Sequence, residues 1–134
     1  MHEPATNMPK TNIQQHVFID ALPSKVWKIL THQEYTIQFF PDDFVFDWKE
    51  GGPIYLKDEE KGRIEEIIPG VSLKFSLQQG ARTFVYSYNI NPDANGVALN
   101  MNCNGFADND EEYLLRLQQL QLTLQKIKWL AEYS

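Results

Sequence analysis

Residues 71–106 read VSLKFSLQQGARTFVYSYNINPDANGVALNMNCNGF, and this stretch decides the fold class. Side chains alternate along it between apolar and polar in three runs, which are separated by residues 79–80 and 92–96. Such alternation places successive side chains on opposite faces of a β-sheet. Short connections rich in Gly, Pro, Asn and Asp favour hairpins, so the pairing is predicted to be antiparallel. The predicted strands are 71–78, 82–90 and 97–106, and their apolar faces carry Leu73, Phe75, Leu77, Phe84, Tyr86, Tyr88, Ile90, Val97, Leu99, Met101 and Cys103.

A long amphipathic helix is predicted directly after these strands. Asp108, Asn109, Asp110, Glu111 and Glu112, four of them acidic, favour a helix start, and the segment that follows contains no Gly or Pro as far as Tyr133. About 22 residues would give a helix about 33 Å long, which is enough to cross the sheet and cover its apolar face. One apolar stripe recurs along it at steps of four and three: Tyr113, Leu117, Leu120, Leu124, Ile127 and Ala131.

The residues before position 71 predict one strand, two short helices and three further strands. Residues 13–19 alternate as a strand does, Pro23 suits the first turn of a helix, and Pro41 ends a second helix over 33–39. Turn-forming residues then separate strands at 44–48, 54–57 and 63–68. Residues 1–11 offer little to bury, so we expect them to form a mobile tail before a single domain at 12–134.

Composition and charge narrow the class of protein. Of the 134 residues, 43% are hydrophobic and 22% are charged, as in ordinary globular domains. Twelve Lys and Arg against 18 Asp and Glu give a net charge of −6, whereas nucleic-acid-binding proteins need a basic surface. No apolar run is long enough to cross a bilayer, and the first ten residues lack the apolar stretch of a signal peptide. We therefore expect a cytoplasmic protein that neither binds nucleic acid nor inserts into a membrane.

Metal and cofactor chemistry have no sequence signature in this chain. Cys103 is the only cysteine, and the three histidines do not stand at metal-ligand spacing. Nucleophile motifs of the Ser/His/Asp kind and phosphate-binding glycine loops are also missing. We expect no metal and no cofactor, and the sequence assigns no catalytic residue.

The order of the predicted elements resembles the helix-grip fold, with one strand, two short helices, six strands and a long C-terminal helix. Four segments carry a closer match: IDALPSKVWKILT (19–31), DWKEGGPIYL (47–56), GRIEEIIPG (62–70) and YLLRLQQLQLTLQKIKWLAE (113–132). Together they resemble the START-like or birch-pollen-allergen-like (SRPBCC) superfamily, in particular the homologues of the activator of the heat-shock-protein-90 ATPase. This resemblance implies an α+β domain in which a curved antiparallel sheet of about seven strands wraps around the C-terminal helix. The family often has a Trp where this chain has Tyr113.

The resemblance also implies a cavity between the sheet and the helix that binds an apolar or amphipathic small molecule. In the alternative interpretation the same side chains fill a solid core, because apolar residues in strands are usually buried. Tyr86 and Tyr88 are the most informative, since a buried hydroxyl needs a hydrogen-bond partner. The candidate ligand-binding residues on the inward face are Phe75, Leu77, Phe84, Tyr86, Tyr88, Leu99 and Met101.

Glu66 is a further candidate for the same cavity. It shares the more apolar parity of residues 63–68 with Ile64 and Ile68, and burial would favour its neutral form. A β-bulge that turns Glu66 towards solvent is the alternative. An inward Glu66 beside a tyrosine hydroxyl would suit a general base, so a small enzyme is one alternative to a binding protein.

Leu115, Leu122 and Trp129 recur every seven residues on the face opposite the apolar stripe of the predicted helix. They are either scattered exposed apolar side chains or the centre of an interface. In the second case two copies of the helix would pack about a two-fold axis, which suggests a homodimer. A protein-interaction module related to chaperone activators is therefore the other alternative.

Overall fold

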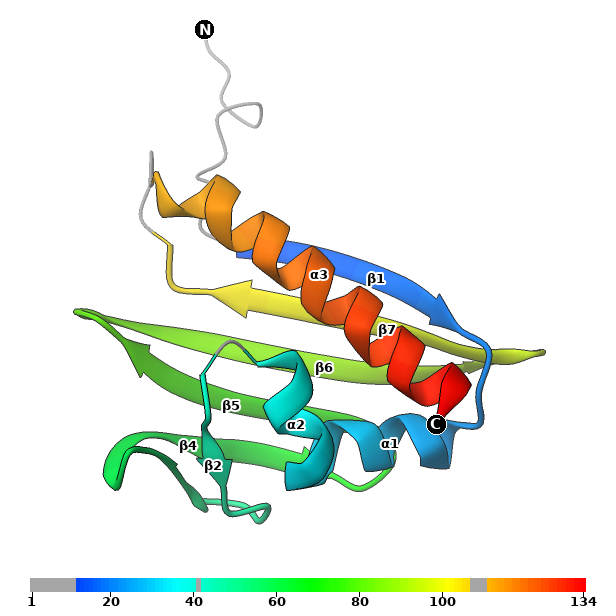
Figure 1. Ribbon diagram of the computed structural model, residues 1–134, viewed down its shortest axis with the longest axis horizontal. Coiled ribbons are helices and arrows are strands. Elements are labelled where there is room, and N and C mark those ends of the chain that lie inside the picture. Colours follow the sequence, from blue (N-terminus) through cyan, green and yellow to red (C-terminus); the bar gives the residue numbers. More distant parts are fainter. Residues whose placement is uncertain (1–11, 41, 107–110) are drawn as a thin grey trace, which may run out of the picture.

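The computed structural model describes residues 12–40, 42–106 and 111–134, and it has an α+β helix-grip fold (Figure 1). The expected tail at 1–11 and most of the acidic run before the last helix lie outside the described residues. The elements follow the predicted order, and an eight-residue strand and a 22-residue helix open and close the series. Their bounds are β1 (Asn12–Ile19), α1 (Pro23–Thr31), α2 (Gln33–Phe39), β2 (Val45–Phe46), β3 (Pro53–Leu56), β4 (Glu59–Ile68), β5 (Ser72–Gln79), β6 (Arg82–Asp93), β7 (Gly96–Asn104) and α3 (Glu112–Tyr133).

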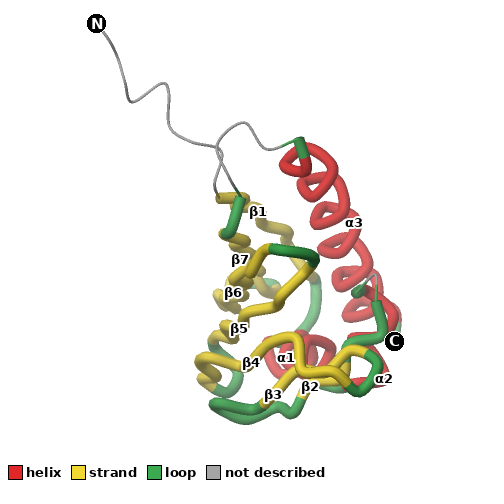
Figure 2. The backbone as a smooth tube through the Cα atoms, turned by 90° about the vertical axis from the view of Figure 1, so that its left-hand side faces the viewer, coloured by secondary structure: helices red, strands yellow, loops and turns green. Residues whose placement is uncertain are grey.

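The seven described strands form one curved sheet in the order β1-β7-β6-β5-β4-β3-β2, and every neighbouring pair is antiparallel. The described helices lie together on one face of this sheet (Figure 2). In Figure 1, α3 runs in front of β1 and β7, and α1 and α2 lie in front of the strands beside them. The sheet and α3 therefore enclose the interior from two sides, as the helix-grip resemblance implies.

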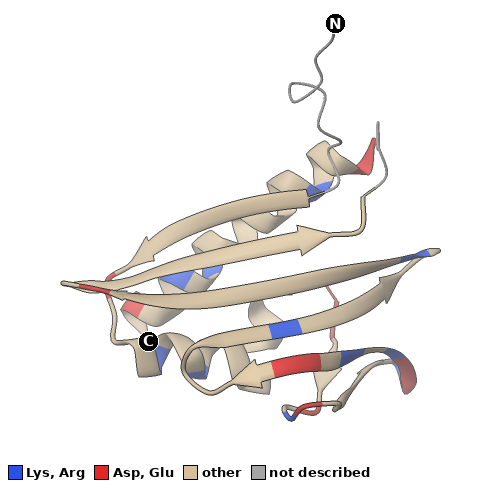
Figure 3. Cartoon of the chain, turned by 180° about the vertical axis from the view of Figure 1, so that it is seen from behind, with Lys and Arg blue, Asp and Glu red and all other residues tan. Residues whose placement is uncertain are grey.

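The core lies between the sheet and the helices. The apolar side chains that alternate along β5, β6 and β7 are all buried, and so are Leu120, Leu124, Ile127 and Ala131 of α3. The outer sheet face behaves differently (Figure 3): β1 and β7 carry no charged residue, and charges gather on β4, on Lys74 of β5 and at strand ends. One face is buried and the other is polar, which is the arrangement that alternating strands predict.

The β3–β4 hairpin differs from its predicted form. We expect a turn at residues 58–62, but β4 already begins at Glu59, and the turn is made by Lys57 and Asp58, with φ angles of 53° and 65°. Gly62 lies inside β4 rather than in the turn. A Cβ on Gly62 would lie 1.9 Å from the backbone oxygen of Ser76, so this glycine permits close approach of β4 to β5.

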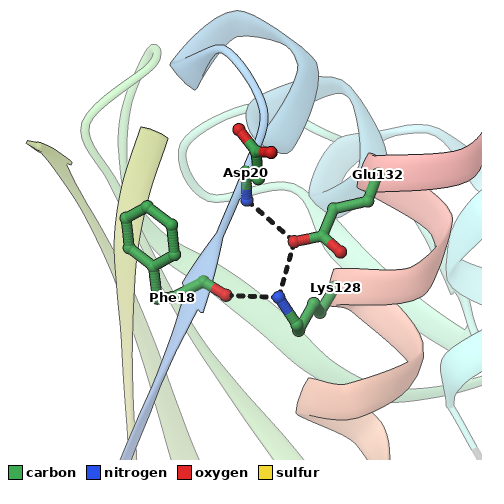
Figure 4. Close-up of polar contacts among 4 residues, drawn as sticks. All are labelled: Phe18, Asp20, Lys128 and Glu132. Atoms are coloured by element: carbon green, nitrogen blue, oxygen red, sulfur yellow. Dashed lines mark hydrogen bonds and ion pairs between the residues drawn. The ribbon is translucent and has the colours of Figure 1, made fainter. Parts of the chain in front are cut away.

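Side chains of α3 bind the backbone of β1 at both ends of that strand. The Tyr113 hydroxyl donates to the carbonyl oxygen of Asn12 over 3.3 Å. At the other end, Lys128 Nζ donates to the carbonyl oxygen of Phe18 over 2.9 Å and also bonds the carboxylate of Glu132 (Figure 4). Because β1 is an edge strand, these contacts occupy backbone groups that would otherwise be open to pairing with another chain.

Candidate functional site

The seven apolar candidates lie on the inner face of three adjacent strands, β5, β6 and β7. None of them is more than 2% exposed: Phe75, Leu77, Phe84, Tyr86, Tyr88, Leu99 and Met101. These seven side chains therefore point inward, as predicted. Their role as ligand-binding residues stays a prediction, since burial is equally a property of core residues.

An aromatic cluster packs over the middle of this face, and Phe40 lies at its centre. Phe40 follows α2 directly, and its ring centroid lies 6.0 Å from that of Phe75 and 6.5 Å from that of Tyr86. The rings of Phe75 and Tyr86 stack on each other at 5.1 Å, and Phe46 lies 5.4 Å from Phe40. Phe40 is only half-buried, so it forms the boundary between the buried aromatic residues and the surface.

The two tyrosines of β6 differ in their hydrogen bonding. The Tyr86 hydroxyl donates to Oε1 of Gln79 over 2.7 Å. The Tyr88 hydroxyl is buried and has no hydrogen-bond partner among the described residues. Burial raises the pKa of both phenols above their usual value, so both hydroxyls keep their protons.

Arg116 brings a positive charge to the same interior. Its guanidinium carbon lies 4.7 Å from the centroid of the Phe84 ring, and its side chain is 14% exposed. The positive charge of Arg116 acts on both Tyr86 and Cys103, where it opposes the effect of burial on each pKa. Our sequence reasoning missed Arg116. Helical spacing could have indicated its inward position, because Arg116 stands three residues after Tyr113 and four before Leu120, on the same stripe of the helix.

Cys103 is buried on β7, next to these groups. Burial raises the pKa of the Cys103 thiol to about 12. The thiolate is the nucleophilic form of cysteine, so this residue stays an inert thiol near neutral pH. Within the described ranges, no three His, Cys, Asp or Glu side chains are grouped so that they could hold a metal ion.

The inward placement expected for Glu66 is wrong. The register between β4 and β5 shifts between Ile64 and Glu66, and Glu66 is exposed. The shift is the bulge alternative: one extra residue in β4 reverses the alternation, so the side chains after it exchange faces. A general base at Glu66 beside the interior tyrosines is therefore not what this fold provides.

Four hollows in the described surface lie away from the tyrosines. The first has a volume of about 630 Å³ and lies between Asp42, Val45 and Tyr55 on β2, β3 and the residues next to them. Another, of about 450 Å³, is a groove between α2 and α3 that is lined by Phe39, Phe40 and Leu122. None of these four hollows is lined by Tyr86 or Tyr88.

The outer face of α3 exposes the heptad of apolar side chains as predicted. Leu115, Leu122 and Trp129 are 59%, 70% and 54% exposed. The ammonium of Lys126 lies 5.5 Å from the centroid of the Trp129 ring. In the described part of the chain, no helix is long and apolar enough to cross a membrane.

A curved antiparallel sheet that grips a long helix over a buried aromatic face defines the class of protein: a START-like helix-grip domain. The sequence profile of one family, described as Activator of Hsp90 ATPase homolog 1-like protein, matches residues 20–132. The chain belongs to this family. No curated protein matches the sequence at a significant level.

Several solved structures share the fold. Protein CV1439 from Chromobacterium violaceum is 19% identical with a TM-score of 0.73, over 92% of this chain and 99% of that one. The Aha1 dimer from Colwellia psychrerythraea is 14% identical with a TM-score of 0.75, over 91% and 96%. CalU16 from Micromonospora echinospora is 18% identical with a TM-score of 0.70, over 88% and 71%. Likeness at these identities shows a common fold and carries no function with it.

Proposed function

We propose that this domain binds a small apolar or amphipathic molecule among the aromatic side chains between the sheet and its helices. The observation that carries the proposal is the buried Tyr88 hydroxyl, which has no partner among the described residues. Leaving a buried hydroxyl unpaired costs about 1–3 kcal/mol, and a phenylalanine would avoid that cost. A polar group on a bound molecule would supply the missing partner.

The groove between α2 and α3 offers the route inward. Phe40 lines this groove of about 450 Å³ on the outside and contacts Phe75 and Tyr86 on the inside. A turn of the Phe40 side chain would open the groove towards Phe75 and Tyr86, and Phe75 in turn stacks on Tyr88. Rotation of this half-buried side chain is a local change, so the route needs no movement of the sheet. Phe40→Ala should speed the uptake of an apolar probe, and Ile37→Ala, at an exposed position of α2, should not change it.

Binding is favoured over catalysis by the same interior. Glu66 is exposed, the Cys103 thiol stays protonated, and both tyrosine hydroxyls keep their protons. A general base or nucleophile would need the opposite of these properties. Among the described residues of the interior, hydrogen-bonding groups are present but no group is poised to accept a proton.

Native mass spectrometry of freshly purified protein tests the proposal, together with fluorescence titration of the uncharged probe N-phenylnaphthylamine. We expect an added mass that is lost on denaturation, or uptake of the probe, and weaker retention in Tyr88→Phe. Tyr86→Phe is the matched control, because the Tyr86 hydroxyl already bonds Gln79. The proposal would be overturned if the native mass equalled that of the polypeptide alone and the protein also took up no probe.

Self-association is a second proposal, and the outer face of α3 favours it. Leu115, Leu122 and Trp129 are all more than half exposed, and α3 has no Asp or Glu between Arg116 and Lys128 although the chain carries a net charge of −6. A solved neighbour, Aha1 from Colwellia psychrerythraea, is described as a dimer. We propose a homodimer in which this face of each copy meets the other, so the domain would also act as an interaction module.

A further inference from the structure

Arg116 stands on the side of α3 that faces the sheet, where the surrounding positions are apolar. Tyr113 and Leu117 beside it are half-buried, and Leu120 one turn later is buried. The Phe84 ring lies under the guanidinium at 4.7 Å, and Phe106 packs against Phe84 at 5.0 Å. A guanidinium over an aromatic ring is stabilised by the ring's negative face, so Arg116 is held in place without using up its N–H donors.

The acid that pairs with Arg116 lies on the solvent side. Nη2 of Arg116 is 3.6 Å from the carboxylate of Glu112, whose side chain is 56% exposed while that of Arg116 is 14% exposed. A guanidinium has five N–H donors in a planar fork, and a single contact of this length does not saturate them. The ion pair with Glu112 therefore leaves N–H donors of Arg116 available to a ligand.

No carboxylate is buried in the described part of the interior around Arg116. Among the described residues, the buried polar side chains are Thr36 and Thr123, and no Asp or Glu is buried. The carboxylate expected inside, Glu66, is exposed. The described partner of Arg116, Glu112, is largely exposed, so the inner side of the guanidinium favours a ligand that brings an anion.

We propose that Arg116 selects anionic amphiphiles, so that the bound molecule carries a carboxylate or sulfonate-like head group at Arg116 and an apolar body against Phe84 and Phe75. The inference rests on the proposed binding function and names the chemical class of its ligand. Charge-assisted hydrogen bonds from a guanidinium to such a head group are short and strong, and the fork geometry matches two oxygens.

Two fluorescent probes with the same apolar body test this selectivity. Anilinonaphthalene sulfonate carries a sulfonate, and N-phenylnaphthylamine is the same molecule without it. We expect the native protein to bind the sulfonate at least about tenfold more tightly. In Arg116→Met the ratio should fall to about one with uncharged-probe affinity kept, and Arg116→Lys should restore part of the preference. Retained binding of the uncharged probe shows that a variant is folded.

Lys49→Met is the control for binding at the surface, because Lys49 is 70% exposed and lies outside the groove between α2 and α3. The sulfonate preference should survive this change, and its loss would overturn the role of Arg116. Equal affinity of the native protein for the two probes would also overturn that role while leaving the binding function intact. Failure of the native protein to bind the uncharged probe would instead count against the binding function itself.

Discussion

The carboxylate of Glu132 accepts a hydrogen bond of 2.8 Å from the backbone N–H of Asp20, which joins the last turn of α3 to the residue after β1 (Figure 4). Lys128 bonds the same carboxylate and the carbonyl oxygen of Phe18. One donor and one acceptor of the chain at the end of β1 are thus satisfied by two side chains of α3. This contact fixes how far along the sheet the helix lies.

Glu132→Gln should destabilise the protein at neutral pH and have little effect in acid. The Asp20 N–H, and after it Lys128, hold the pKa of Glu132 below its ordinary value of 4.5. A lowered folded-state pKa means that the stabilisation is complete above about pH 4.5 and is lost as the pH falls through the folded-state value. We expect a loss of about 1 kcal/mol in the free energy of unfolding at pH 7, measured by urea denaturation.

Glu50→Gln is the matched control for this pH dependence, because Glu50 is exposed in the loop before β3. It should leave the free energy of unfolding nearly unchanged at both pH values. If Glu132→Gln lowered the free energy of unfolding equally at pH 7 and at pH 3, the negative charge of Glu132 would not contribute to the stabilisation.

Tyr88→Phe and Tyr86→Phe should change stability in opposite directions. The Tyr88 hydroxyl is buried without a partner in the described structure, whereas the Tyr86 hydroxyl bonds Gln79 at 2.7 Å. Removing the first should raise the free energy of unfolding of the ligand-free protein by about 1 kcal/mol, and removing the second should lower it by about the same amount. Urea denaturation of refolded protein measures both. A loss in both variants would indicate that Tyr88 is already satisfied.

Gly62→Ala should destabilise the protein much more than Gly70→Ala. A Cβ at Gly62 meets the Ser76 backbone oxygen, and backbone atoms of adjacent strands cannot move aside cheaply. Gly70 has open space around it but a φ of +77°, so its alanine variant carries only local backbone strain of about 1 kcal/mol. We expect a loss of at least about 2 kcal/mol for Gly62→Ala in thermal or urea unfolding. Similar losses in the two variants would contradict the close approach.

The fold was predictable because its main signals are periodic. Strict alternation in residues 71–104 sets both the strands and their inward faces, and α3 follows from a stripe at helical spacing. The β3–β4 hairpin was misplaced because Gly62 has two uses: it can form a turn, or it can let two strands approach closely. Only the neighbouring strand distinguishes them, and the sequence does not contain that distance.

The site was predictable only where it follows the same periodicity. Tyr86 and Tyr88 were found because they alternate with polar residues, whereas Glu66 was misplaced because one bulge reverses the faces after it. Phe40 and Arg116 were missed because their importance lies in contacts between elements far apart in the sequence. Helical spacing alone could have placed Arg116 inward, but the aromatic ring beneath it comes from β6.

The exposed face of α3 can meet its own copy without charge repulsion from carboxylates. With Leu122 on the two-fold axis, Leu115 of one copy would face Trp129 of the other in an antiparallel arrangement, over about 21 Å of helix. A standard interface buries about 800 Å² on each partner, which is more than three side chains supply. The contact would therefore need further side chains of α3, such as Tyr133, which is 73% exposed and packs beside Trp129.

Leu122→Lys should convert a native dimer into monomers, because two added charges would meet at the axis of the interface. Leu122 is 70% exposed, so the change leaves the core intact. Gln121→Lys adds the same charge one residue away, on the side of α3 that borders β1, and should leave the dimer in place. Sedimentation velocity at micromolar concentration measures all three proteins. A monomeric native protein, or equal dissociation by both lysines, would rule out an interface centred on Leu122.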